Sequence, residues 1–220
     1  MEFDLKNSIL KTGTTIVGIV CKDGVILAAD RRATAGNMIM EKDHSKIDYV
    51  TDYVLMAHTG GVADAQFSVK IIGAELRLKE LRSKRRPTVK EAANFIALST
   101  YQNIRQPSMI PFIVGNLIAG VNPDGSAELY SVEPAGGIVK VKTFDANFSS
   151  GMPFVLGFLE RHWKENLSVE EGVNLAVESV KSSTQRDSAS GGGIDVYTLT
   201  KDGIKKVIDQ KIEAAYNKRE

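Results

Sequence analysis

A threonine preceded by a glycine stands where a short polar lead meets the first apolar stretch of the chain, in the sequence KTGTTIVGI. Cleavage of the peptide bond between Gly13 and Thr14 would give a chain that begins with threonine and carries a hydroxyl nucleophile and a free α-amine. That amine has an unperturbed pKa of about 8, so it can act as the base for its own hydroxyl. The alternative for these residues is a glycine turn that leads into a threonine-rich strand.

An aspartate and a lysine further along the chain could activate such a nucleophile. Asp30 directly follows the apolar run 25–29, and a carboxylate at the end of a buried strand usually has a partner. Lys46 would supply that partner and would place a positive charge beside the amine and hydroxyl of Thr14. This charge disfavours the protonated amine and stabilises a developing alkoxide. An exposed surface ion pair is the alternative for these two residues.

Three polar residues and one glycine complete the candidate site. Gly60 ends an apolar run and could offer its backbone N–H to an oxyanion, although an ordinary turn glycine would look the same. Ser150, Asp187 and Ser190 could form a hydrogen-bonded group that orients the Thr14 amine and a water molecule. The alternative for these three residues is a Ser/Gly-rich loop with an aspartate cap.

Hydrophobic patterns predict the elements that position these residues. They indicate strands at 15–20, 25–29, 53–57, 112–121, 127–132, 138–143, 194–200 and 204–208. They indicate helices around 67–81, from 88 onward, at 153–163 and from 168 onward. Segregated blocks of strands and helix pairs favour an α+β fold. We expect a four-layer α-β-β-α sandwich, in which two antiparallel sheets pack together and a helix pair covers each outer side.

Two details of the helices can be predicted further. The apolar positions of the first helix are Phe67, Ile71, Ala74, Leu78 and Leu81, which we expect to form its buried face. Thr88 with Glu91, and Ser168 with Glu171, have the spacing of capping boxes. The segment 31–46 is polar and is expected to be a loop with short strands.

Composition excludes several classes of function. Of the 220 residues, 43% are hydrophobic and 25% are charged, which is ordinary for a globular protein. A net charge of +1 provides no basic field for nucleic acid. Cys21 is the only cysteine, so no intrachain disulfide can form, and it is expected to be a small buried hydrophobe. The three histidines match no metal-ligand spacing.

The start of the chain resembles a leader rather than a targeting signal. The first 13 residues contain Glu2 and Asp4 and lack an apolar core. No apolar run reaches the roughly 18 residues that a membrane span requires. We therefore expect a cytoplasmic protein with a removable propeptide, residues 1–13, and a single domain, residues 14–220.

The combined motifs are similar to those of proteasome β subunits of the archaeal 20S type, which are N-terminal-nucleophile (Ntn) hydrolases. The motifs are GTT at 13–15, AADRR at 28–32, SSG at 149–151 and RDSASG at 186–191, together with Lys46 and Gly60. Asp30 and Lys46 follow Thr14 by 16 and 32 positions, as in the family. The likeness extends from Thr14 to about Ile208, and the motifs keep the family's order.

The resemblance implies a threonine endopeptidase that needs no metal ion or organic cofactor. It would be a zymogen that removes residues 1–13 autocatalytically and then degrades unfolded proteins inside a closed chamber. Its partners would be other β subunits in a seven-membered ring, rings of a separate α subunit and, indirectly, an ATP-dependent unfoldase. The site residues that the resemblance implies are Thr14, Asp30, Lys46, Ser150, Asp187 and Ser190, with Gly60 as the oxyanion donor.

The resemblance also implies a pocket for the side chain on the acyl side of the cut bond. Its lining would be Ala33, Thr34, His44, Asp48, His58 and Val62. A neutral His58 at the pocket floor would accept apolar side chains only moderately well, whereas a protonated one would attract acidic side chains. A core histidine turned away from the pocket is the alternative. The family usually has other residue types at positions 48 and 58, so the resemblance does not fix the cleavage specificity.

Two other functions fit parts of the pattern. A non-catalytic β subunit would keep the fold and fill a position in a mixed ring. The unusual pocket residues slightly favour that function. The residues that weigh against it are the intact Thr14, Asp30, Lys46, Asp187 and Ser190. A small-molecule amidase of the same fold is disfavoured by the RDSASG motif and by the order of the helix pairs.

Overall fold

The computed structural model describes residues 13–109 and 111–213. Of the predicted leader, residues 1–13, only Gly13 is among the described residues. The described part of the chain forms two five-stranded sheets, one two-stranded ribbon and four helices. None of these helices has an apolar stretch long enough to cross a membrane.

The first sheet has the strand order β10-β1-β2-β11-β12, and its neighbouring strands are antiparallel. Its strands are β1 (Ile16–Cys21), β2 (Gly24–Asp30), β10 (Phe144–Asp145), β11 (Gly193–Thr200) and β12 (Gly203–Lys211). The β1–β2 and β11–β12 hairpins turn at Asp-Gly sequences, as predicted. The candidate nucleophile, Thr14, lies two residues before β1, and the candidate carboxylate, Asp30, ends β2.

The second sheet has the order β5-β6-β7-β8-β9 and is also antiparallel. Its strands are β5 (Ile47–Thr51), β6 (Val54–Gly60), β7 (Val114–Val121), β8 (Ala127–Val132) and β9 (Ile138–Lys140). A separate ribbon pairs β3 (Ala33–Ala35) with β4 (Met38–Glu41), so the polar segment 31–46 does contain short strands. β7 and β9 are shorter than the predicted strands 112–121 and 138–143.

The four described helices are α2 (Val62–Ser83), α3 (Val89–Ile104), α4 (Met152–His162) and α5 (Val169–Thr184). Both predicted capping boxes are present. Thr88 and Ser168 accept the backbone N–H of Glu91 and Glu171, and each glutamate accepts the N–H of its cap residue in return. These local signals fix where α3 and α5 begin.

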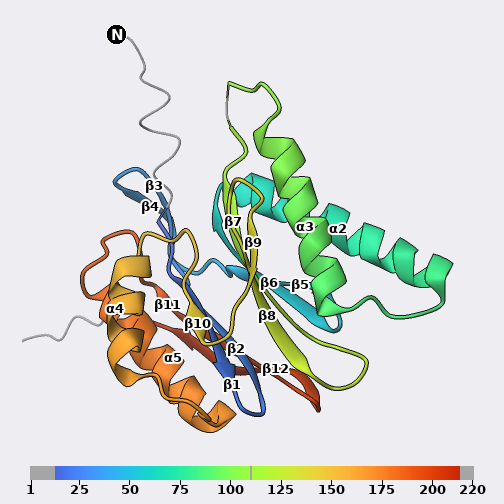
Figure 1. The fold of residues 1–220 in the computed structure, drawn as a ribbon. Coiled ribbons are helices and arrows are strands. Elements are labelled where there is room, and N and C mark those ends of the chain that lie inside the picture. The colour runs from blue at the N-terminus through green and yellow to red at the C-terminus, as the bar shows by residue number, and fades with distance from the viewer. Residues whose placement is uncertain (1–12, 110, 214–220) are drawn as a thin grey trace, which may run out of the picture.

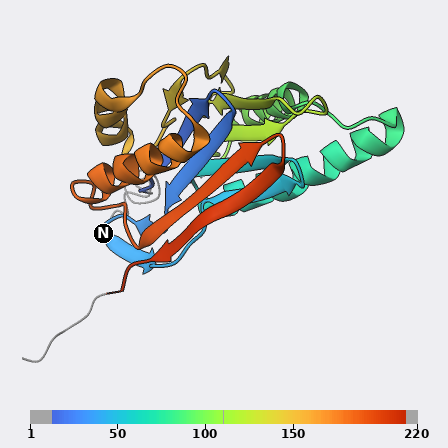
Figure 2. The same cartoon turned by 90° about the horizontal axis from the view of Figure 1, so that it is seen from below.

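The layers confirm the predicted α-β-β-α sandwich. Figure 1 shows α4 and α5 covering one sheet while α2 and α3 cover the other. In Figure 2, strands β1, β2, β11 and β12 lie side by side with α5 along them. Leu27, Leu55 and Leu117 belong to the apolar cluster between the sheets, and two further clusters lie beneath the helix pairs. The candidate site lies at one end of the space between the sheets.

The predicted buried face of the first helix, α2, is wrong. Phe67, Ile71 and Leu81 are 56%, 44% and 68% exposed, whereas Ile72 and Leu76 are buried against the second sheet. The helix carries apolar residues on two sides, and Ile72 and Leu76 have the same four-residue spacing as the predicted face. Packing against β5 and β6 decides which side is buried, and spacing along the helix does not reveal that packing.

Candidate active site

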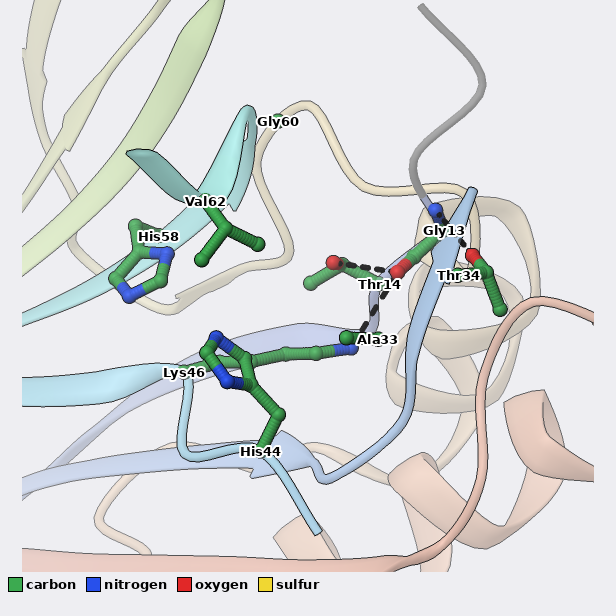
Figure 3. A pocket seen from close by; sticks show the side chains of 9 residues that line it. All are labelled: Gly13, Thr14, Ala33, Thr34, His44, Lys46, His58, Gly60 and Val62. Carbon is green, nitrogen blue, oxygen red and sulfur yellow. Dashed lines mark hydrogen bonds between the residues drawn. The ribbon is translucent and has the colours of Figure 1, made fainter. Parts of the chain in front are cut away.

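Thr14 lies two residues before β1 and is only 6% exposed. Its carbonyl oxygen accepts a hydrogen bond from the backbone N–H of Gly151 (3.2 Å) and lies 3.0 Å from the hydroxyl oxygen of Ser150. Its own hydroxyl donates to the Gly13 carbonyl oxygen at 2.7 Å, and Lys46 Nζ donates to that oxygen at 3.4 Å. Figure 3 shows both contacts. The candidate nucleophile, the bond predicted to be cut and the lysine therefore converge on one carbonyl group.

The Asp30 carboxylate fixes this arrangement through four hydrogen bonds. Its Oδ1 accepts hydrogen bonds from Lys46 Nζ at 2.6 Å and from the backbone N–H of Thr15 at 2.8 Å. Its Oδ2 accepts from the backbone N–H groups of Arg32 (3.1 Å) and Gly191 (2.8 Å). Asp30 has no exposed surface, so these four donors replace the water that a carboxylate would otherwise bind. The expected Lys46–Asp30 pair is therefore a buried ion pair and not a surface one.

Burial changes the acid strength of Lys46. Loss of solvation lowers the pKa of its ammonium group below the ordinary lysine value, while the Asp30 carboxylate acts in the opposite direction. The Asp30 carboxylate therefore favours the charged form of Lys46 against the cost of burial. In its charged form, Lys46 can stabilise negative charge that develops on the nearby Gly13 carbonyl oxygen.

Ser150, Asp187 and Ser190 form one hydrogen-bonded group. The hydroxyls of Ser150 and Ser190 each donate to Oδ2 of Asp187 at 2.6 Å. The backbone N–H of Thr14 donates to Ser150 Oγ at 2.9 Å. The nitrogen that would become the free amine after cleavage is therefore linked to a carboxylate through a single hydroxyl group.

A small hollow adjoins Thr14. It is lined by Gly13, Thr14, Ala33, Thr34, His44, Lys46, His58, Gly60 and Val62. Figure 3 shows His44, His58 and Val62 grouped across from Thr14. The predicted pocket residue Asp48 is not among the lining residues, but its Oδ2 lies 3.0 Å from Nε2 of His58. His58 thus lines the hollow, although it is only 4% exposed. Asp48, outside the lining, fixes the imidazole through this hydrogen bond.

Gly60 needs to be a glycine for two reasons. Its φ of +99° lies in a region that favours glycine. A Cβ atom at this position would also lie 2.0 Å from the carbonyl oxygen of Ile113. Gly60 closes β6 and lines the hollow beside Thr14, which is where the oxyanion donor is expected.

Sequence reasoning missed two hydroxyl groups next to this site. Thr15 Oγ1 lies 2.7 Å from Ser190 Oγ and 2.5 Å from Ser183 Oγ, and all three residues are fully buried. Ser183 lies on the buried face of α5, three positions after Val180. A serine at an otherwise apolar helical position was the available signal, because a buried hydroxyl requires a partner.

Fold and site together define a class of protein. Two antiparallel sheets lie between helix pairs, and a buried threonine stands at the start of a central strand, with a lysine and a carboxylate beside it. This is the architecture of N-terminal-nucleophile hydrolases.

Comparison with known sequences gives the family. A family model described as "Proteasome subunit" matches residues 10–199. "Proteasome subunit beta" of Ferroglobus placidus is 39% identical over 206 residues, which cover 94% of this chain and 95% of the relative. The subunits of the same name from Methanocaldococcus jannaschii and Archaeoglobus fulgidus are each 40% identical over 91% of this chain, and the matches cover 88% and 92% of those relatives. The chain therefore belongs to the proteasome subunit family, and these three relatives are archaeal β subunits.

Proposed function

We propose that this chain is a catalytic β subunit of a 20S proteasome core and acts as a threonine endopeptidase. The observation that carries the proposal is the convergence of the Thr14 hydroxyl and Lys46 Nζ on the Gly13 carbonyl oxygen. The Thr14 nitrogen is bonded at the same time to Ser150. A purely structural subunit would require none of these contacts.

The first reaction would be removal of the leader, residues 1–13. Thr14 Oγ attacks the carbonyl carbon of Gly13 and loses its proton, and the Gly13–Thr14 C–N bond breaks as the nitrogen gains a proton. Water then hydrolyses the resulting ester, so the leader departs with a new carboxylate and Thr14 keeps a free hydroxyl and a free amine. Lys46 stabilises the negative charge on the Gly13 carbonyl oxygen during the attack.

The same groups would then cut a substrate. The Thr14 amine accepts the proton of its own hydroxyl, Oγ attacks the scissile carbonyl carbon, and the amine passes the proton to the leaving nitrogen. Water hydrolyses the acyl ester and restores the hydroxyl. Lys46, held by Asp30, lowers the energy of the alkoxide, and the backbone N–H of Gly60 binds the oxyanion.

Family membership indicates that the chain works in a proteasome core with other subunits. We propose that β subunits form a seven-membered ring stacked on rings of a separate α subunit, and that an ATP-dependent unfoldase delivers unfolded polypeptides. Enclosure suits an unspecific protease, because it keeps folded proteins away from the site. Exposed apolar residues on α2, such as Phe67 and Leu81, support coverage by another subunit.

Intact mass and peptide hydrolysis test this function in the particle assembled from this chain and its α subunit. The wild type should lose residues 1–13 and hydrolyse fluorogenic peptides. Thr14→Ala should retain the leader and show no hydrolysis, and Lys46→Ala should assemble and lose nearly all of both activities. A wild-type particle that retains its leader and hydrolyses nothing would instead identify a non-catalytic β subunit.

A further inference from the structure

A chain of buried hydroxyl groups runs from the end of α5 to the candidate site. Ser183 Oγ lies 2.5 Å from Thr15 Oγ1, which lies 2.7 Å from Ser190 Oγ. Ser190 Oγ in turn lies 2.6 Å from Oδ2 of Asp187. Ser183, Thr15 and Ser190 have no exposed surface, so no bulk water can replace a missing partner. Neither Thr15 nor Ser183 has a role in the reaction steps proposed above.

The carboxylate fixes the direction of every hydrogen bond in this chain. A carboxylate only accepts, and a hydroxyl has one proton to donate. Ser190 therefore donates to Asp187 and must accept from Thr15, and Thr15 must then accept from Ser183. The hydrogen bonds therefore all run in one direction: Ser183 donates to Thr15, Thr15 donates to Ser190, and Ser190 donates to the Asp187 carboxylate.

The same carboxylate oxygen fixes Ser150 on the other side. Ser150 Oγ is 2.6 Å from Oδ2 of Asp187 and 3.0 Å from the Thr14 carbonyl oxygen. The charged acceptor is the closer one and forms the stronger bond, so it takes the single Ser150 proton. Ser150 is then left as an acceptor, and it accepts the N–H of Thr14. After cleavage, the amine would keep a proton directed at Ser150 and its lone pair free for its own hydroxyl.

Gly151 shows that the loop next to the site is shaped around the hydroxyl pair. A Cβ atom at Gly151 would lie 1.9 Å from Thr15 Oγ1 and 2.2 Å from Ser183 Oγ. Its φ is an ordinary −79°, so backbone conformation does not demand a glycine here. The requirement comes from the two hydroxyls. Gly151 also donates its backbone N–H to the Thr14 carbonyl oxygen, so the pair packs against the segment that holds the nucleophile.

We propose that Thr15 and Ser183 are positioning residues for the Thr14 amine, which they serve by fixing the direction of the hydrogen bonds around Asp187. This inference rests on the proposed function, because it concerns the amine that acts as base. Without the Thr15 hydroxyl, Ser190 loses its donor inside the protein, and Ser190 and Asp187 are free to rearrange. Ser150 can then turn its proton toward the amine and occupy the lone pair that the reaction requires.

The test compares Thr15→Val and Ser183→Ala with the wild type in the assembled, processed particle. Each should lower kcat for a fluorogenic peptide by about tenfold, the effect of one displaced hydrogen bond, with little change in KM. The acidic limb of the rate against pH should also move to lower pH, because a Ser150 hydroxyl that donates to the amine favours its neutral form. Thr15→Ser keeps the hydroxyl and should restore both the rate and the pH profile.

Ser182→Ala is the matched control. Among the described residues, its hydroxyl bonds only the carbonyl oxygens of Ser179 and Phe154, at 2.7 and 3.4 Å, so its loss disturbs the same end of α5 without touching the site. An equal effect of Ser182→Ala on rate and pH profile would overturn the inference. So would an unchanged rate and profile in both test variants of an active particle.

The failure of the proposed function can be recognised separately. If the wild-type particle is inactive, both the proposed function and this inference are wrong. If the wild type is active and the rate and pH profile of both variants match it, this inference alone is wrong. Thermal unfolding of each variant shows whether it folds. If Thr15→Val does not fold, Ser183→Ala, which removes one oxygen atom at the far end of the chain of hydroxyls, carries the same expectation.

Discussion

Lys46 Nζ lies 2.6 Å from Oδ1 of Asp30, and the two side chains are 3% and 0% exposed. The two members of the pair differ in what else they bind. Asp30 also accepts three backbone N–H groups, from Thr15, Arg32 and Gly191, which lie on three separate segments. Within the described part of the chain, the Lys46 side chain makes one further hydrogen bond, to the Gly13 carbonyl oxygen. Asp30 therefore joins the backbone segments of the site, whereas Lys46 reaches the carbonyl group of the bond that we propose is cut.

This asymmetry predicts different effects on stability. Asp30→Asn should lower the free energy of unfolding by about 3–5 kcal/mol, because it leaves the Lys46 charge buried without its counterion and turns an NH₂ group toward backbone donors. Lys46→Met should cost less, because the carboxylate keeps its backbone donors. Urea unfolding of the isolated subunit in the Thr14→Ala background measures both without processing. Equal losses would contradict the proposed role of Asp30.

Gly13 predicts a steric limit on processing. A Cβ atom at this position would lie 1.7 Å from Cβ and 2.8 Å from Cα of Ala189. Gly13→Ala should therefore displace the carbonyl group from Thr14 and slow the loss of residues 1–13 by about a hundredfold or more, as misplacement by 1 Å can do. Intact mass against time after assembly follows this reaction.

Ala189, the residue that a side chain at position 13 would clash with, provides the control for Gly13→Ala. Ala189→Gly removes the nearest of the three contacting atoms of Ala189, so it should partly restore processing to Gly13→Ala. Ala189→Gly alone should process at nearly the wild-type rate. Normal processing of the single Gly13→Ala variant would show that the carbonyl position does not depend on this contact.

Cys21 should be inert in the folded protein. Burial, with smaller contributions from the Asp23 and Glu171 carboxylates, raises the pKa of its thiol to about 12. The unfolded thiol has a pKa of about 8.5, so the native state holds its proton longer and this group makes stability fall as pH rises through that interval. At pH 8, labelling by a disulfide reagent should be at least about a hundredfold slower in the native protein than in urea. Rapid labelling of the native protein would contradict this pKa.

The two sides of α2 should differ in what they contribute to the isolated subunit. Leu76 is 2% exposed and Leu81 is 68% exposed, so Leu76→Ala should cost about 2–5 kcal/mol of unfolding free energy and Leu81→Ala less than about 0.5 kcal/mol. Urea unfolding of the isolated chain measures both. Similar losses would show that the predicted face, which includes Leu81, is buried in solution after all.

Local patterns and the family resemblance predicted most of the architecture. The Asp-Gly hairpins and the two capping boxes depend on residues a few positions apart, and they are found where predicted. The Lys46–Asp30 contact followed from motif order, because the resemblance fixes which distant segments meet. The buried side of α2 could not be read from helical spacing, since two faces satisfied it.

The hydroxyl cluster shows a second limit of the sequence. Thr15 and Ser183 are 168 positions apart, and the serine on the buried face of α5 signals a need for a partner without saying which residue it is. Their contact exists because the end of α5 packs over the start of β1 in the folded chain. The resemblance placed Asp48 near His58, but their hydrogen bond was visible only once β5 and β6 were placed in register.

The last prediction concerns substrate choice in the hollow beside Thr14. His58 Nε2 lies 3.0 Å from Asp48 Oδ2, and a carboxylate partner places the proton on Nε2. In the neutral ring Nδ1 is then an acceptor, and none of the described hydrogen bonds of His58 uses it. An apolar substrate side chain that covers this nitrogen would remove its water without replacing the hydrogen bond.

His58→Leu should therefore raise kcat/KM for peptides with leucine on the acyl side of the cut bond, relative to those with glutamine, by about tenfold or more. Fluorogenic peptides that differ only in that residue measure the ratio at pH 7.5 with the processed particle. Asp48→Asn is the matched control: it keeps the imidazole beside the hollow and should move the ratio much less. A ratio that is the same in wild type and His58→Leu would show that the imidazole does not contact the substrate side chain.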